Sequence, residues 1–128
     1  MSVTVVNPKD IRKPAGPYSH GLVVEPGKRW LFTTGQVAIT LEGEIPEGAE
    51  AQSLLVWQHL KALLVEAQME VTNIVKTTVH VTSAETMAIH NKVRNTILGS
   101  HCPVTTATIV SALANPRYLV EVDIVACL

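Results

Sequence analysis

The segment from residue 73 to residue 82 alternates in the way that is typical of a β-strand. β-Branched residues dominate it, and such side chains pack well on a pleated surface. Alternation predicts two faces: one carries Val75, Thr77, Val79 and Val81, and the other carries Ile74, Lys76, Thr78 and His80. We expect helices to cover the first face. The second face is half polar and must meet water, a ligand or another subunit.

Two amphipathic helices are predicted on either side of this strand. In the first, Ala49 to Gln68, apolar residues recur at helical spacing: they are Val56, Leu60, Leu63, Leu64 and Ala67. In the second, the run Thr82-Ser83-Ala84-Glu85 predicts a capping box at the start, and Gly99 suits the end. The predicted apolar stripe of this second helix is Ile89, Val93 and Ile97.

Val3–Val6 is a short β-branched run. Further strands are predicted at Leu22–Glu25, Trp30–Thr33, Val37–Leu41, Pro103 to about Ala112, and Tyr118–Cys127. Pro26-Gly27-Lys28 predicts a hairpin between the strands Leu22–Glu25 and Trp30–Thr33, and Asn7 to Pro17 predicts an ordered loop or an exposed arm. After the first run the order is β-β-β-α-β-α-β-β. We therefore predict a single α+β domain over residues 1–128, with both helices on one face of a mixed sheet.

Composition favours an assembly of several copies. Hydrophobic residues make up 47% of the 128 residues, charged residues make up 16%, and the mean hydropathy is +0.25. A thinly charged surface is often covered by partners, and burying the bare sheet face between subunits would account for the apolar excess. The net charge of −1 provides no electrostatic footprint for nucleic acid, so no nucleic-acid partner is expected.

The sequence predicts a cytoplasmic protein in a reducing compartment. No signal peptide opens the chain. The longest apolar region, Ser53–Val65, is interrupted by Gln58, His59 and Lys61, so no membrane span is expected. Cys102 and Cys127 have neither metal-site spacing nor a disulfide framework, and the five histidines show no spacing for a metal.

Four motifs stand in an order and spacing that point to a known family. They are Gly16-Pro17-Tyr18-Ser19, Thr34-Gly35-Gln36, Val75-Lys76-Thr77-Thr78-Val79 and Val120-Glu121-Val122-Asp123. Over nearly its whole length the chain resembles the Rid, or YjgF-type, reactive-intermediate deaminases, also described as endoribonuclease L-PSP-like. The resemblance implies a chorismate-mutase-like α+β fold and a homotrimer with a central barrel of sheets, helices outside, and three ligand clefts between subunits. It implies hydrolysis of reactive imines and enamines, such as 2-iminopropanoate, to a keto acid and ammonia without a metal or organic cofactor.

The chain departs from the family where an arginine is expected. The family motif after the second helix is Pro-Ala-Arg-Ser, whereas this chain has Pro103-Val104-Thr105-Thr106, and Ala107 replaces a cysteine that usually follows. An arginine fork binds a carboxylate bidentately, and losing a buried clamp of this kind costs about 2–5 kcal/mol. The substrate would then lack a small 2-carboxylate, or bind it through backbone donors and Thr105. Arg117, in the last turn, either reaches into the cleft or is solvated.

Candidate site residues each have a functional and a structural interpretation. Tyr18 follows Gly16-Pro17 in a loop, where its ring either faces a ligand or packs. The resemblance gives Glu121 the role of holding or activating water. Asp123 shares the face of Glu121 and would raise its pKa by like-charge repulsion, or lies at the surface. Gly35 serves the backbone, because glycine allows a close approach to a ligand or a positive φ.

The remaining candidates are weaker. Thr105 and Thr106 offer hydroxyls to a neutral group, although threonine is also a common strand former. Lys76 is an intersubunit or solvated charge. His20, close to Tyr18, is the histidine to test for proton transfer, whereas we interpret His59 and His90 as structural or surface residues.

Three functions follow from the sequence. The first is a hydrolase that deaminates a small imine or enamine; a ring-cleavage enamine of the aminomuconate type would suit a site without the arginine. The second is a non-catalytic trimer that binds a small molecule and has lost the chemistry. The third is an endoribonuclease, against which stand the near-neutral charge and the few aromatic residues available for base stacking.

Overall fold

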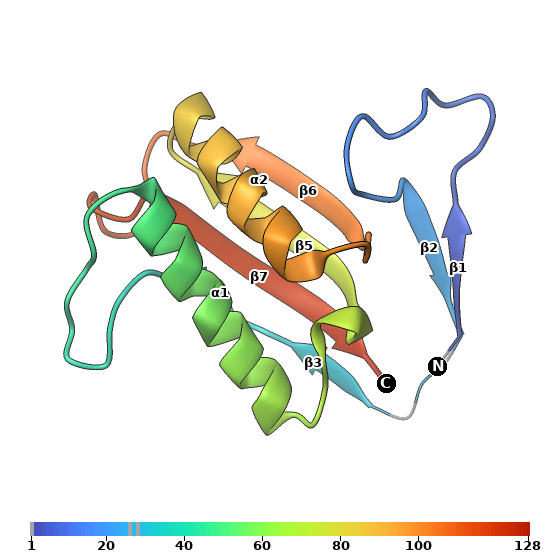
Figure 1. Cartoon of the computed structure of the whole chain (residues 1–128), viewed down its shortest axis with the longest axis horizontal. Helices are drawn as coiled ribbons and strands as arrows, with labels where there is room; N and C mark the ends of the chain where they lie inside the picture. Colours follow the sequence, from blue (N-terminus) through green and yellow to red (C-terminus); the bar gives the residue numbers. More distant parts are fainter. Residues whose placement is uncertain (1, 26, 28) are drawn as a thin grey trace.

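The chain folds as two helices packed on one face of a mixed β-sheet (Figure 1). The computed structural model describes residues 2–25, 27 and 29–128. In the main sheet the order is β3-β7-β5-β6, and β4 also pairs with β7. β5 and β6 run parallel, and the other pairs in this sheet are antiparallel. The predicted α+β fold with both helices on one face is confirmed.

The elements have the following bounds. The helices are α1 (Ala49–Glu66) and α2 (Ala84–Leu98), and a 3-10 turn, η1 (Val71–Asn73), leads into β5. The main-sheet strands are β3 (Trp30–Phe32), β4 (Gln36–Val37), β5 (Ile74–Val81), β6 (Val104–Ile109) and β7 (Val120–Cys127). The N-terminal strands are β1 (Val3–Val6) and β2 (Gly21–Val24).

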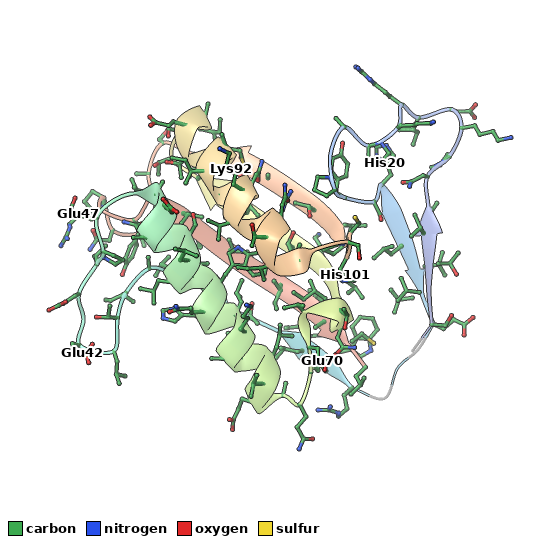
Figure 2. All side chains as sticks on the ribbon, viewed as in Figure 1. His20, Glu42, Glu47, Glu70, Lys92 and His101 are labelled. Carbon is green, nitrogen blue, oxygen red and sulfur yellow. The ribbon has the colours of Figure 1, made fainter. Side chains whose placement is uncertain are left out.

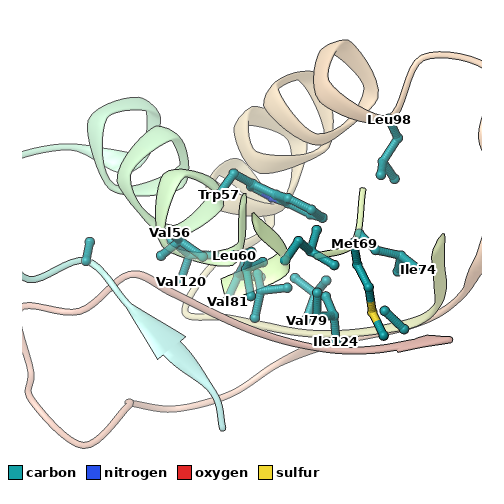
Figure 3. Close-up of a cluster of buried hydrophobic side chains, with 14 residues drawn as sticks. Val56, Trp57, Leu60, Met69, Ile74, Val79, Val81, Leu98, Val120 and Ile124 are labelled. Carbon is teal, nitrogen blue, oxygen red and sulfur yellow. The ribbon is translucent and has the colours of Figure 1, made fainter. Parts of the chain in front are cut away.

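The hydrophobic core lies between the sheet and the two helices (Figure 3). α1 contributes Trp57, Leu60 and Leu64, which are almost entirely buried. Alternate residues of β7 face them: these are Val120, Val122, Ile124 and Ala126. The Nε1 atom of Trp57 donates a hydrogen bond to Nε2 of His90 on α2 at 3.1 Å. This bond joins the two helices inside the core.

The two predicted faces of β5 are correct from Lys76 onward. The helix-facing residues are Thr77, Val79 and Val81, and the open-face residues are Lys76, Thr78 and His80. The prediction for Ile74 is wrong, because Ile74 is fully buried in the core. The register with β7 shifts between Ile74 and Lys76, and such a bulge turns the residue before it to the other face.

The predicted hairpin between the second and third strands is wrong. β2 pairs with β1 in a separate two-stranded sheet at one side of the molecule (Figure 1), and β3 pairs with β7. Of the predicted turn, Pro26 and Lys28 lie outside the described residues. Beside β7, Leu31 packs against the core. The N-terminal segment returns to the main sheet at a bridge between Ser19 and Val104.

The ends of α2 are capped by its sequence neighbours. Ser83, rather than Thr82, is the N-cap, and its Oγ accepts a hydrogen bond from the backbone N–H of Thr86 at 3.1 Å. The predicted capping box is therefore one residue out of phase. Gly99 ends the helix as predicted, with a φ of 59° that glycine adopts without strain.

The burial of α2 is also shifted by one residue from the predicted stripe. Val93 and Ile97 are only half-buried. The most buried residues recur at intervals of four: they are Thr86, His90, Arg94 and Leu98. His90 and Arg94 are therefore buried, whereas the predicted stripe had placed only aliphatic side chains of this helix in the interior.

Candidate functional site

A cavity of about 320 Å³ lies between the N-terminal loop, α2 and β6. Its volume falls at the lower end of the range for small-molecule sites. All three elements contribute residues to its lining, among them Tyr18, Asn91, Arg94, Asn95, Thr105 and Ala107. The cavity thus contains the predicted pair Tyr18 and Thr105, together with a cation that the sequence reasoning did not propose.

The N-terminal loop holds Tyr18 against β6. The hydroxyl of Ser19 donates to the carbonyl of Cys102 at 2.8 Å, and the backbone of Ser19 bridges to Val104. These contacts hold the loop at the start of β6. The Tyr18 hydroxyl accepts a hydrogen bond from the N–H of Ala15 at 3.3 Å, and the ring stays half-buried beside the cavity.

Thr105 lies on the helix side of the sheet. It pairs with Thr77 of β5, and the two Oγ1 atoms are 2.7 Å apart. Because Thr77 is fully buried, this hydrogen bond satisfies a hydroxyl that has no access to water. Thr106, the next residue, is exposed and shares the open face with Thr78. Alternation along the strand therefore separates the two threonines that the sequence grouped together.

Arg94 is the site residue that sequence reasoning missed. Its side chain leaves α2 and is only 5% exposed, and its Nε and Nη2 atoms donate to Oδ1 of Asn95 at 3.2 and 3.0 Å. Burial lowers the pKa of the Arg94 guanidinium, and the nearby Cys102 thiol opposes this effect. The feature of the sequence that could have indicated it is the spacing of Arg94 four positions after His90, which places both side chains on one side of α2.

Glu121 lies on the other side of the sheet from Thr105. Its neighbours Val120 and Val122 face the core, so the Glu121 side chain points to the open face, where Glu121 pairs with His80. Within one chain, Tyr18 and Thr105 therefore share a cavity, and Glu121 does not share it with them. Asp123 is two residues along β7 and shares the open face with Glu121.

Gly35 is placed by the sheet directly beside Glu121. A Cβ atom built on Gly35 would lie 2.7 Å from both Cδ and Oε2 of Glu121. Real Cβ atoms do not approach other atoms so closely, so the missing side chain creates the space that the carboxylate occupies. Glycine allows a close approach here, and within the chain its neighbour is the side chain of Glu121.

Arg117 and His20 lie outside the cavity of Thr105. Arg117 donates to the carbonyl of Ile45 at 3.1 Å and pairs with Glu47 at 3.7 Å, so within the chain it serves the loop before α1. His20 lies in the N-terminal segment beside the β1–β2 hairpin (Figure 2), and its Nε2 is 2.6 Å from the carbonyl oxygen of Arg12. Its ring meets that of Tyr18 edge-on at 5.8 Å.

The open face of the sheet combines polar and apolar residues. Lys76 and His80 lie on β5. On β3, the rings of Trp30 and Phe32 stack with centroids 6.3 Å apart, although they are 46% and 71% exposed. Within residues 2–25, 27 and 29–128, no three potential metal ligands gather and no helix is long and apolar enough to cross a membrane.

Comparison with known proteins identifies the family. Residues 9–128 match the family model described as Endoribonuclease L-PSP. The chain belongs to the Endoribonuclease L-PSP family. Among its relatives, a RutC family protein of Buchnera aphidicola from Acyrthosiphon pisum is 36% identical over 90 residues, which cover 70% of this chain and 68% of that protein. The predicted Rid-type family is confirmed.

Two further family members connect the chain to solved structures. The Rid family protein YyfB of Yersinia pestis has a TM-score of 0.84 and 30% identity over the whole of both chains. TdcF of Escherichia coli K12, named as a candidate reactive intermediate deaminase, is 34% identical over 87 residues, which cover 67% of this chain and 65% of TdcF. A structure of Escherichia coli TdcF with bound serine matches with a TM-score of 0.73 and 26% identity over 98% of each chain.

Proposed function

We propose that this protein is a reactive-intermediate deaminase that hydrolyses a small imine or enamine and releases ammonia. The observation that carries the proposal is a cavity lined by Tyr18 and Thr105 in a member of the Endoribonuclease L-PSP family. The similarity to TdcF, a candidate reactive intermediate deaminase with a serine-bound structure, supports it. We propose no ribonuclease activity for this chain, although the family description names one. A net charge of −1 offers little attraction for RNA phosphates.

The reaction transfers both protons of water from oxygen to nitrogen. Water adds to the carbon of the C=N bond and loses one proton to a base, while the nitrogen takes up a proton to give a carbinolamine. The nitrogen then takes up a second proton and leaves as ammonia, while the carbinolamine hydroxyl loses its proton and becomes the carbonyl. An enamine first takes up a proton at carbon to become the imine. In this proposal the carboxylate of Glu121 holds and deprotonates the water, and the hydroxyl of Tyr18 hydrogen-bonds the substrate. Thr105 lines the cavity beside them, and no step uses a metal or an organic cofactor.

A homotrimer would bring these groups together. Glu121 is on the open face and the cavity of Tyr18 is on the helix side, so the site requires Glu121 of one copy to meet the cavity of a neighbouring copy. The exposed aromatic pair, Trp30 and Phe32, supports an assembly that covers the open face, because exposed apolar patches commonly mark interfaces. In this arrangement Thr106 and Arg117 would contact a ligand only from a neighbouring copy.

The first test measures ammonia release from 2-iminopropanoate generated in situ and from an enamine without a carboxylate. We expect Glu121→Gln and Tyr18→Phe each to reduce the rate at least about tenfold, since positioned proton-transfer groups typically contribute a hundredfold or more. Asp123→Asn is the matched control for Glu121→Gln, because it makes the same neutralising change on the same face of β7 and should leave most of the rate.

Two outcomes would contradict the proposal. Ammonia release by the wild-type protein no faster than in buffer on every substrate would favour a non-catalytic binding protein. A stable monomer in sedimentation analysis, with full activity, would rule out a site shared between copies.

A second prediction concerns Gly35. Gly35→Ala should displace the carboxylate of Glu121, because the added methyl group would lie 2.7 Å from its present position. The end of a flexible side chain can rotate away, so we expect a loss of ammonia release with little change in melting temperature. In the double variant Gly35→Ala/Glu121→Gln the two losses should not add. Additive losses would mean that Gly35 acts independently of Glu121.

A further inference from the structure

The guanidinium of Arg94 is a buried positive charge with no acidic partner. It is 5% exposed, and within the described ranges 2–25, 27 and 29–128 no aspartate or glutamate forms an ion pair with it. Its hydrogen-bond acceptor is the neutral amide oxygen of Asn95. Burying a charge is costly unless it is paired, so this arrangement favours binding of an anion from outside the chain.

The Arg94 guanidinium has N–H donors that remain available to such an anion. A guanidinium has five N–H donors in a planar fork. Asn95 takes up the edge formed by Nε and Nη2. The outer edge, formed by Nη1 and Nη2, therefore has no hydrogen-bond partner of its own among the described residues. That outer edge presents two parallel N–H groups, which can bind a carboxylate with two hydrogen bonds. Asn95 fixes the plane of the fork and so reduces the entropy lost when a ligand binds.

The cavity contains this cation and Thr105 together. Arg94 and Asn95 come from α2, while Thr105 and Ala107 come from β6. Thr105 stands where the resemblance to the family expects an arginine, and its hydroxyl bonds Thr77. A guanidinium thus enters the same cavity from the helix in place of the strand.

We infer that Arg94 binds the carboxylate of a small 2-imino or 2-enamino acid in the cavity beside Tyr18 and Thr105. The identity of the ligand as a substrate rests on the proposed function, to which this inference adds that the substrate carries a carboxylate. It replaces the expectation that the missing strand arginine excludes small carboxylate substrates. Thr105 then lies beside the ligand, and the positive charge of Arg94 makes the site selective for a negatively charged ligand.

The test uses the intact protein in its native assembly with two matched ligands. Pyruvate is a small 2-keto carboxylate, and pyruvamide is its uncharged counterpart. In titration calorimetry the wild-type protein should bind pyruvate and bind pyruvamide far more weakly. Arg94→Gln should weaken pyruvate binding about thirtyfold or more, as expected for loss of a bidentate clamp, and leave pyruvamide unchanged. Lys92→Gln removes the same charge from the exposed side of α2 (Figure 2) and should change neither.

Enzyme kinetics provide a second test of the role of Arg94. For 2-iminopropanoate, Arg94→Gln should raise KM by a similar factor, with a smaller change in kcat, and the hydrolysis of a carboxylate-free enamine should be unaffected. In the double variant Arg94→Gln/Thr105→Arg, a guanidinium supplied from β6 should restore part of the pyruvate affinity. The melting temperature of Arg94→Gln should not fall, because the change removes a buried charge without an acidic partner.

The outcomes separate this inference from the proposed function. Pyruvate binding that depends on Arg94, in a protein with no deaminase activity, would support the anion site and refute the enzyme. Full deaminase activity with pyruvate affinity and KM unchanged in Arg94→Gln would support the enzyme and overturn the role of Arg94. Equal losses for pyruvate and pyruvamide would also overturn it, because they would indicate a structural role for the side chain.

Discussion

Replacing Leu60 with alanine is expected to lower the free energy of unfolding by about 2–5 kcal/mol. Leu60 is completely buried among side chains from α1 and the sheet (Figure 3). Truncation removes apolar surface from the core and leaves a cavity that rigid neighbours such as Trp57 cannot fill. Since domains are stable by only about 5–15 kcal/mol, this single change should remove a large part of the total.

The same helix provides a matched control. Leu54 also lies on α1 but is 46% exposed, so Leu54→Ala should change the free energy of unfolding by less than about 0.5 kcal/mol. Urea unfolding at a fixed protein concentration, followed by circular dichroism, measures both variants. Similar losses for Leu54→Ala and Leu60→Ala would contradict the packing of α1 described above.

Lowering the pH from 6.5 to 4 should destabilise the protein through His90. Burial, and next the positive charge of Arg94, lower the pKa of this histidine from 6.5 to about 4. Between these values the unfolded chain binds a proton that the folded chain does not, so acid favours unfolding. The contribution of His90 is complete above pH 6.5. It declines by about 1.4 kcal/mol per pH unit, to a total loss of about 3 kcal/mol near pH 4.

His90→Gln isolates this effect from the titration of carboxylates. Glutamine cannot take up the proton, and its amide oxygen can accept the hydrogen bond that Trp57 donates to His90. The free energy of unfolding, measured with urea, should fall between pH 7 and pH 5 in both proteins. We expect this fall to be about 2 kcal/mol larger in the wild-type protein than in His90→Gln. Identical pH dependence in the two proteins would mean that His90 titrates normally in the folded state.

Local pattern was sufficient for most elements but not for their partners; the strand predicted at Val37–Leu41 is an exception, because β4 covers only Gln36–Val37. The alternation of β5 predicted its two faces from Lys76 onward, and Gly99 ended α2 where expected. Ile74 and the hairpin could not be predicted, because a bulge and a strand pairing depend on which distant segment supplies the neighbouring strand. Leu31 gains its contact with the core only beside β7, and nothing in its local sequence points to that strand.

Of the candidate residues predicted from the sequence, Tyr18 and Thr105 line the cavity within one chain, whereas the geometry of the site was not predictable. Alternation alone separates Thr105 from Thr106, but the face that each takes is set by the register of β6 against β5. Arg94 was missed because a one-residue error in the phase of α2 assigns a charge to the exterior. The predicted stripe and the buried residues His90, Arg94 and Leu98 both recur every four positions, so spacing alone could not fix the phase of the helix.

The place of β7 in the sheet affects how the protein can be made. It follows every other strand in the sequence, yet it lies between β3 and β5, and Thr33 bonds to Ile124 across 91 residues. Ribosomes add roughly 5–20 residues per second, so β3 must wait on the order of ten seconds for its partner. During that time the apolar side of α1 has no sheet to cover it, and the nascent chain offers a target for chaperones.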